Sequence, residues 1–195
     1  MGEVDIPNLE ELEELKAKSF TKRVALITAI FAVVLAITSL GGNNVTKGML
    51  LSQQQASDQW AFYQSKAMRE HLYRTNKEMV KAVLLERGSL MNPAARDHYE
   101  ALEQKFGGEE ARYRQEKAKI EKDAKTLEAD RDLNNSRDPY FDYAEVLLQI
   151  AIVMSSISIL SGSRIIFYFS LGSAALGSLL SLNGYLLLFT IPFFH

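Results

Sequence analysis

VALITAIFAVVLAITSL, residues 24–40, contains no charged residue and directly follows Lys22 and Arg23. As an α-helix, these seventeen residues nearly cross a hydrocarbon layer of about 30 Å, at about 1.5 Å per residue. The uncharged run continues through Thr46. The stretch therefore predicts a transmembrane helix over residues 21–42.

Two further apolar stretches follow near the C-terminus. From Pro139 to the last residue, the only charged side chains are Asp142, Glu145 and Arg164. We expect a second transmembrane helix over residues 139–161, with Asp138 as its N-cap and Pro139 in its first turn. A tight turn at 161–164 then leads to a third transmembrane helix over residues 165–191.

The segment between these spans, residues 43–138, has a different composition. From Asn44 to Asp138 the chain carries 17 Lys and Arg against 16 Asp and Glu. Helix-forming residues over 49–87 and 93–132 predict two helices of about 58 and 60 Å, joined by a turn around Gly88. Helices of equal length return the chain to the membrane, so we expect an extramembrane antiparallel hairpin. Residues 41–44 would end the first span, as a helix stop or a flexible joint.

Apolar residues recur along both arms of this hairpin. The first arm carries a helix-face pattern of Ala61, Met68, Leu72, Met79 and Val83, which Trp60, Tyr63 and Ala67 widen. The second arm carries a heptad seam of Tyr99, Phe106, Tyr113, Ile120 and Leu127. We expect these two sets to pack the arms together as a coiled coil, with Gly107 and Gly108 loosening the second arm.

Residues 1–20 form an acidic segment without the positive charge of a secretory signal. Asn8 and Glu11 resemble a capping box, which predicts a short amphipathic helix; a frayed acidic tail explains the composition equally well. The basic residues near the first span are Lys16, Lys18, Lys22 and Arg23. They favour a cytoplasmic N-terminus, which places the hairpin and the C-terminus on the outer side.

The third span contains small residues at four-residue spacing. The set consists of Gly172, Ser173, Ala174, Gly177, Ser178 and Ser181. Membrane helices associate through close packing at such residues. Because these small residues exceed what three spans of one chain need, we expect them to mediate helix packing and homo-oligomerisation.

Four polar residues within the spans have two interpretations. Asp142, Glu145 and Gln149 share one face of the second span, and Asn183 lies deep in the third. In an oligomer they could line a pore or a polar path. The simpler interpretation is that the acids favour the positive end of the helix dipole and that the amides form interhelical hydrogen bonds.

Sites for chemistry are not recognisable in the sequence. Cysteine is absent, and His71, His98 and His195 lack metal-binding spacing. Phosphate-binding loops, nucleophile elbows and paired catalytic carboxylates are not found. The net charge of −2 gives no electrostatic footprint for nucleic acid. We expect no catalytic residue, cofactor or metal, and no enzymatic activity.

One stretch carries a resemblance to a known family. Its residues are Gln55, Asp58, Gln59, Trp60, Tyr63, Gln64, Lys66, His71, Leu72 and Tyr73, a QxxDQWxxYQxKxxxxHLY-like pattern. The chain resembles a family of bacterial membrane proteins described as a domain of unknown function, with one span, a charged helical region and two further spans. The resemblance implies a bacterial inner-membrane protein and no known activity.

The sequence thus predicts an all-α membrane protein with three transmembrane helices and an extramembrane hairpin. We expect a non-enzymatic homo-oligomer whose partners are membrane lipids and further copies of itself, with the hairpin serving as an assembly or interaction scaffold that could also hold another protein. The alternative is a channel or transport protein with a pore lined by polar residues of the last two spans.

Overall fold

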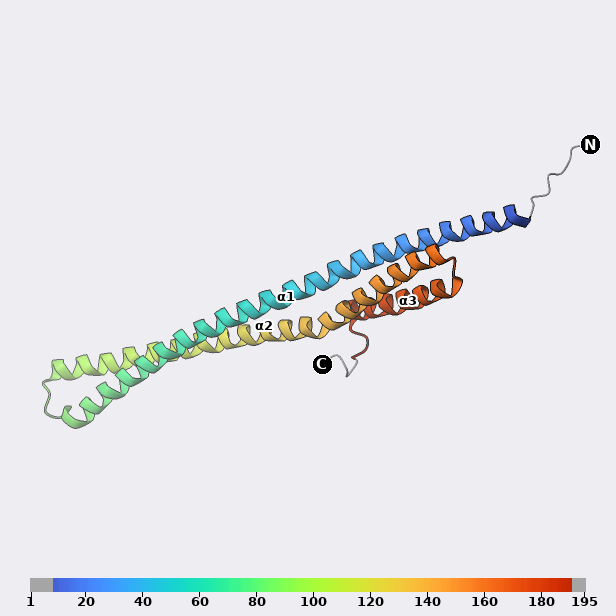
Figure 1. The fold of residues 1–195 in the computed structure, drawn as a ribbon. Helices are drawn as coiled ribbons and strands as arrows, with labels where there is room; N and C mark the ends of the chain where they lie inside the picture. Colours follow the sequence, from blue (N-terminus) through green and yellow to red (C-terminus); the bar gives the residue numbers. More distant parts are fainter. Residues whose placement is uncertain (1–8, 191–195) are drawn as a thin grey trace, which may run out of the picture. The chain divides into compact units, whose positions relative to one another are not determined.

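The protein is all-α, and its computed structural model describes residues 9–190, with side chains from Glu14 onward. Helix α1 spans Leu9–Arg87, α2 spans Pro93–Ser161 and α3 spans Arg164–Leu186. Figure 1 shows the three helices in chain order, from blue α1 to red α3. By length and composition, each of them could cross a membrane.

The chain divides into two compact units, and α1 and α2 contribute to both. The first, which we call the three-helix unit, contains the described residues up to Gly48 and those from Leu133 onward. The second, which we call the hairpin, is Met49–Asp132.

The helix stop considered for residues 41–44 is wrong, because α1 continues through them. Gly41 and Gly42 instead allow close packing against α2. A Cβ at Gly41 would collide with the Tyr185 hydroxyl on α3 and lie 2.7 Å from a ring carbon of Phe141, and one at Gly42 would lie 3.1 Å from the Phe141 Cβ. The glycine pair thus makes room for a buried aromatic ring rather than ending a helix.

The helix start predicted at Asp138 and Pro139 is also wrong, since α2 runs through both residues. Pro139 removes one backbone donor from the helix without interrupting it. Asp138 is not an N-cap; its Oδ1 accepts a hydrogen bond of 2.8 Å from Thr46 Oγ1 on α1. Polar residues that suggest a loop therefore make contacts between two helices.

The N-terminal segment also differs from its prediction. The described residues 9–20 are part of α1 and continue directly into the apolar stretch, so they do not form a separate short helix. Asn8, the predicted capping residue, lies outside the described residues.

The turn between the arms is confirmed. Gly88 follows the end of α1, and its N–H donates to the Leu84 carbonyl at 2.9 Å. A Cβ at Gly88 would collide with that carbonyl oxygen, so the turn requires glycine. Asn92 caps α2 through a 2.8 Å hydrogen bond from the Ala95 N–H to its Oδ1, with Pro93 in the first helical position.

The turn between α2 and α3 is confirmed as well. Helix α2 ends at Ser161 and α3 begins at Arg164. Gly162 adopts a φ of 67°, the left-handed conformation that glycine reaches without strain. The third helix ends earlier than the predicted boundary at 191, since Leu187 takes a left-handed conformation directly after Leu186.

Small and hydroxyl side chains pack the three-helix unit. Hydrogen bonds from hydroxyl side chains join its helices, among them Thr38 Oγ1 to Ser181 Oγ at 2.8 Å, Ser155 Oγ to Ser170 Oγ at 3.0 Å, and Ser173 Oγ to the Leu147 carbonyl at 2.7 Å. An apolar cluster of Phe31, Leu148, Ala151 and Ala174 lies among them. These contacts are typical of membrane helices, which associate through close packing and buried hydroxyls.

The small residues of α3 therefore serve packing within one chain. Ala174, Gly177 and Ser181 are buried, and Ser178 is half-buried with its hydroxyl on the Ala174 carbonyl. Gly172 differs, because a Cβ there would meet no atom within 4 Å. The small residues that the sequence suggested as a surplus are thus largely used for packing inside the chain.

The two glycines of α3 give a matched test of this packing. A Cβ at Gly177 would lie 3.0 Å from the Ala144 carbonyl oxygen and 3.0 Å from Leu148 Cγ. We expect Gly177→Leu to destabilise the three-helix unit by about 1 to 3 kcal/mol, because overpacking forces the helices apart. Gly172→Leu should leave stability nearly unchanged. Thermal unfolding in detergent measures both, and equal melting temperatures would contradict the close α2–α3 contact.

Candidate functional site

The inner faces of the hairpin combine a largely aromatic seam on α2 with a stripe on α1 that contains both apolar and charged residues. On α2, Tyr113 and Ile120 are buried, and Tyr99, Phe106 and Leu127 are half-buried. On α1, the residues at least half-buried at seven-residue spacing are Ala56, Tyr63, Glu70, Lys77 and Leu84. The α1 stripe thus contains charged residues at its centre.

Four residues predicted to pack the arms lie on the opposite face of α1, and Ala61 is the smallest of these exposed residues. Met68, Leu72 and Met79 are 76%, 56% and 63% exposed. The prediction that they pack against the second arm of the same chain is therefore wrong. The physical reason is that a better partner exists for the α2 aromatics: Tyr73 stacks on Tyr113 with ring centroids 5.6 Å apart.

The other residues of α1 that were predicted to pack the arms are half-buried. Val83 is half-buried, and Tyr63 is half-buried with its ring 5.3 Å from that of Trp60. Trp60 Nε1 donates a 2.8 Å hydrogen bond to Glu128 on α2. The distinctive Trp60 therefore joins the two arms through its indole N–H.

Two glutamates, one from each arm, form the centre of the hairpin. The side chains of Glu70 and Glu110 are only 4% and 9% exposed. Four cations surround them. The lysine contacts cross between the arms, with Lys117 Nζ 2.6 Å from Glu70 and Lys77 Nζ 2.6 Å from Glu110. Arg74 and Arg114 each contact the glutamate of their own arm and that of the other arm, at 2.9–3.4 Å. We call these six residues the charge cluster.

The charge cluster arises from an internal repeat. Residues 70–77, EHLYRTNK, and residues 110–117, EARYRQEK, share the pattern ExxYRxxK. Because the arms are antiparallel, the glutamate of each repeat contacts the lysine of the other repeat, and the two tyrosines stack. Analysis of apolar periodicity missed these residues; a comparison of one arm's sequence with the other's would have found them.

The cluster is electrostatically favourable. A hydrogen bond from Lys117 is the main cause that holds the pKa of Glu70 below its usual value, and Lys77 does the same for the pKa of Glu110. Burial opposes both shifts without cancelling them. Both carboxylates therefore stay ionised and fix the register of the arms, because a slip would leave them without cations.

Further contacts between the arms lie between the charge cluster and the open end of the hairpin, and they occur in the same register. Lys66 Nζ lies 2.6 Å from Glu116, and Arg131 donates to Gln53 at 2.9 Å. His71 and His98 are exposed on their arms. Among the described residues, no group of three or more His, Cys, Asp or Glu side chains could hold a metal ion.

The four polar residues predicted as a path in the spans are not alike. Asn183 is buried, and its side-chain amide donates to the Phe189 carbonyl at 2.8 Å and accepts from the Phe189 N–H at 2.9 Å. It thus secures the segment after α3 and does not form the interhelical hydrogen bond of the simpler interpretation. Asp142 and Gln149 are exposed on α2, and Glu145 is half-buried.

The comparisons with known proteins identify the family. The family described as "Domain of unknown function (DUF4337)" matches residues 20–187, and the chain belongs to it. Comparisons with curated proteins and with solved structures found no match.

The charge cluster predicts a specific loss of stability in the hairpin. We expect Glu70→Gln to lower the free energy needed to open the hairpin by about 1 to 3 kcal/mol, because the substitution leaves Lys117 and both arginines without the Glu70 carboxylate. Glu78→Gln is the matched control, since Glu78 is 58% exposed and lies 3.9 Å from its nearest cation. Hydrogen exchange of hairpin peptides in the full chain measures both, and equal effects would contradict the cluster's role.

The lowered pKa values of Glu70 and Glu110 also predict a pH dependence. Their stabilisation is complete above the ordinary glutamate pKa of about 4.3 and is lost as the pH falls below it, through the lowered values. Hydrogen exchange protection of the hairpin, corrected for intrinsic exchange rates, should therefore fall in this acidic range. A Glu70→Gln, Glu110→Gln variant should lose most of this dependence, and an unchanged profile would contradict the assignment.

Proposed function

We propose that the chain is a non-enzymatic, homo-oligomeric protein of the bacterial inner membrane, whose hairpin serves as an assembly scaffold. Three helices apolar enough to span a membrane support the membrane placement. Basic residues before the first apolar stretch favour a cytoplasmic N-terminus and an outer-side hairpin.

The observation that carries the assembly proposal is an uncharged stripe on the outer face of α1. Its members alternate at spacings of four and three and are all exposed: Ala61, Ser65, Met68, Leu72, Thr75, Met79 and Ala82. We call this set the outer stripe. Its apolar members follow the pattern of a coiled-coil seam in an otherwise highly charged hairpin.

A second copy of the chain fits the outer stripe. Copies inserted in one membrane share their orientation, so their α1 helices run parallel and each stripe residue faces its own counterpart. Because the stripe contains no charge, this pairing brings no like charges together at the seam. The flanking residues Gln64, Arg69, His71 and Asn76 also place no two acids opposite each other.

A charge in the outer stripe should prevent assembly. We expect Leu72→Glu to raise the dissociation constant of the oligomer at least about tenfold, because pairing would bury an acid against its counterpart. Leu90→Glu is the matched control, since Leu90 is also exposed but lies in the turn. The mass of the detergent-solubilised protein measures the effect; a monomeric wild type, or an unchanged mass for Leu72→Glu, would contradict the proposal.

The alternative is a channel or transport protein, and one observation favours it. Asp142 and Gln149 are exposed on the part of α2 that could span the membrane, where an unpaired carboxylate is costly in contact with lipid. In an oligomer, these residues and Glu145 could line a polar path.

Ion flux into liposomes separates the two functions. The scaffold proposal predicts no flux above that of empty liposomes for the wild type, Asp142→Asn and Glu145→Gln. A cation flux that falls in these two variants, and not in the hairpin control Asp123→Asn, would contradict the scaffold and support the channel.

A further inference from the structure

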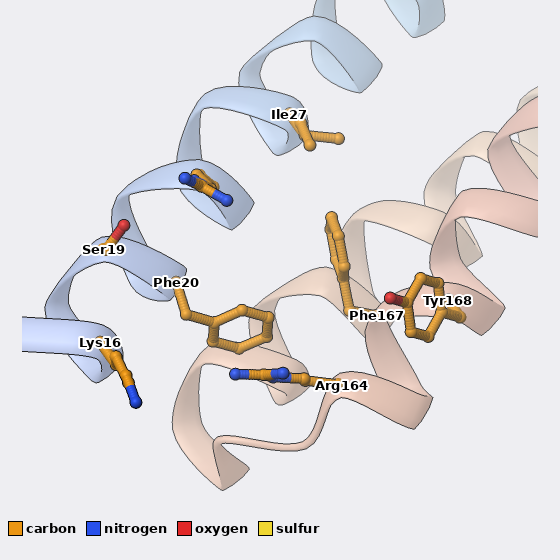
Figure 2. A pocket seen from close by; sticks show the side chains of 8 residues that line it. Lys16, Ser19, Phe20, Ile27, Arg164, Phe167 and Tyr168 are labelled. Atoms are coloured by element: carbon orange, nitrogen blue, oxygen red, sulfur yellow. The ribbon is translucent and has the colours of Figure 1, made fainter. Parts of the chain in front are cut away.

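A cavity of about 390 Å³ lies between the beginning of the apolar part of α1 and the start of α3. Its lining residues are Lys16, Ser19, Phe20, Arg23, Ile27, Arg164, Phe167 and Tyr168. Figure 2 shows Lys16 and Arg164 extending from α1 and α3 toward the same end of the cavity, with the Phe20 ring beside the Arg164 side chain. All of these residues belong to the three-helix unit.

The cavity is strongly cationic. Lys16, Arg23 and Arg164 line it, and the lining contains no acid. Among the described side chains, none of the three cations has an ion-pair partner; the nearby Glu14 pairs instead with Lys18 at 3.6 Å. Three positive charges around one cavity favour an anion, and the Ser19 and Tyr168 hydroxyls can donate further hydrogen bonds to it.

The position of these cations points to a membrane surface. Arg23 immediately precedes the apolar stretch of α1, and Arg164 immediately precedes that of α3. If both stretches span the membrane, both arginines lie at the same boundary, where lipid phosphates are found. Basic pockets between membrane helices on the cytoplasmic side are suited to anionic lipid headgroups.

A second, apolar groove lies between α2 and α3 and shares Tyr168 with the cavity. The groove measures about 650 Å³ and is lined by Leu147, Ile150, Met154, Ile165, Tyr168, Phe169, Gly172, Ser173 and Leu176. Tyr168 lines both spaces, and Gly172 leaves the groove open because even a Cβ at this position would have no neighbour within 4 Å. A ligand that fills both spaces needs an anionic head and an apolar chain.

We propose that the cavity binds the phosphate of an anionic phospholipid, with one acyl chain in the groove beside Gly172. The inference rests on the membrane placement of the proposed function. The phosphate alone would satisfy the cations, but only a lipid also fills the apolar groove, which is why we assign a lipid rather than a free phosphate.

Native mass spectrometry of the full-length protein in detergent tests this assignment, with phosphatidylglycerol and phosphatidylcholine as probes. We expect one phosphatidylglycerol to bind in preference to phosphatidylcholine. The Arg23→Gln, Arg164→Gln variant should bind it at least about tenfold more weakly, since each basic residue contributes about 1 kcal/mol. Lys22→Gln is the matched control, because Lys22 is exposed next to Arg23 but does not line the cavity.

Two further measurements distinguish a lipid phosphate from free inorganic phosphate. Gly172→Leu fills the groove without changing charge and should weaken phosphatidylglycerol binding severalfold. Inorganic phosphate at millimolar concentration should not displace the lipid. An equal loss with Lys22→Gln would overturn the proposal in favour of diffuse surface charge, and displacement by inorganic phosphate or an unaffected Gly172→Leu would overturn the lipid assignment.

Alkaline extraction of membranes separates this inference from the proposed function. Release of the wild-type chain would contradict the membrane placement and hence both proposals. A chain that stays in the membrane and has no preference for phosphatidylglycerol would contradict the lipid site alone. Unchanged melting temperatures of the variants in phosphatidylcholine would exclude misfolding as the cause of a loss.

Discussion

The hairpin depends on the pairing of two buried carboxylates with cations from both arms. Glu70 and Glu110 are almost fully removed from solvent, and each is covered by a lysine from the opposite arm at 2.6 Å. Removing an ionised carboxylate from water is costly unless cations and hydrogen bonds compensate it. The pairing therefore specifies one register, and the stack of Tyr73 on Tyr113 and the Trp60 bond to Glu128 are formed in that register.

The helices inside each of the two units are held together by a different chemistry. In the three-helix unit, glycines and hydroxyl side chains let the helices approach closely, as at Gly177 and between Ser155 and Ser170. In the hairpin, charges and aromatic rings join the arms. This difference follows from the surroundings that we propose, because hydrocarbon offers no hydrophobic force between helices, whereas water favours burial of aromatic rings and solvates unpaired charges.

The sequence predicted the elements better than their boundaries. The turns at Gly88 and Gly162 were predictable because glycine, asparagine and proline act locally there. The close packing at Gly41 was not, because it involves Phe141 and Tyr185, which are far away in the sequence. In the same way, Asp138 suggests a cap until its partner Thr46 is known.

The candidate sites show the same limit. The α2 seam was visible as a heptad, but the face of α1 that meets it was assigned to Met68, Leu72 and Met79 because apolar residues usually face inward. Paired charges overrode that tendency, and only the ExxYRxxK repeat indicates them in the sequence. The cationic cavity was equally hidden, since Arg23 and Arg164 come together only through the packing of α1 and α3.

The central claim is that α1 of the hairpin has an inner face toward α2 and an outer face toward a second copy. The chain contains no cysteine, so single cysteines can be introduced without background. Under mild oxidation in membranes, Leu72→Cys should form disulfide-linked dimers, because parallel copies place this residue opposite itself. Tyr73→Cys, on the inner face, should remain monomeric. Efficient cross-linking through Tyr73→Cys, or none through Leu72→Cys, would contradict the account.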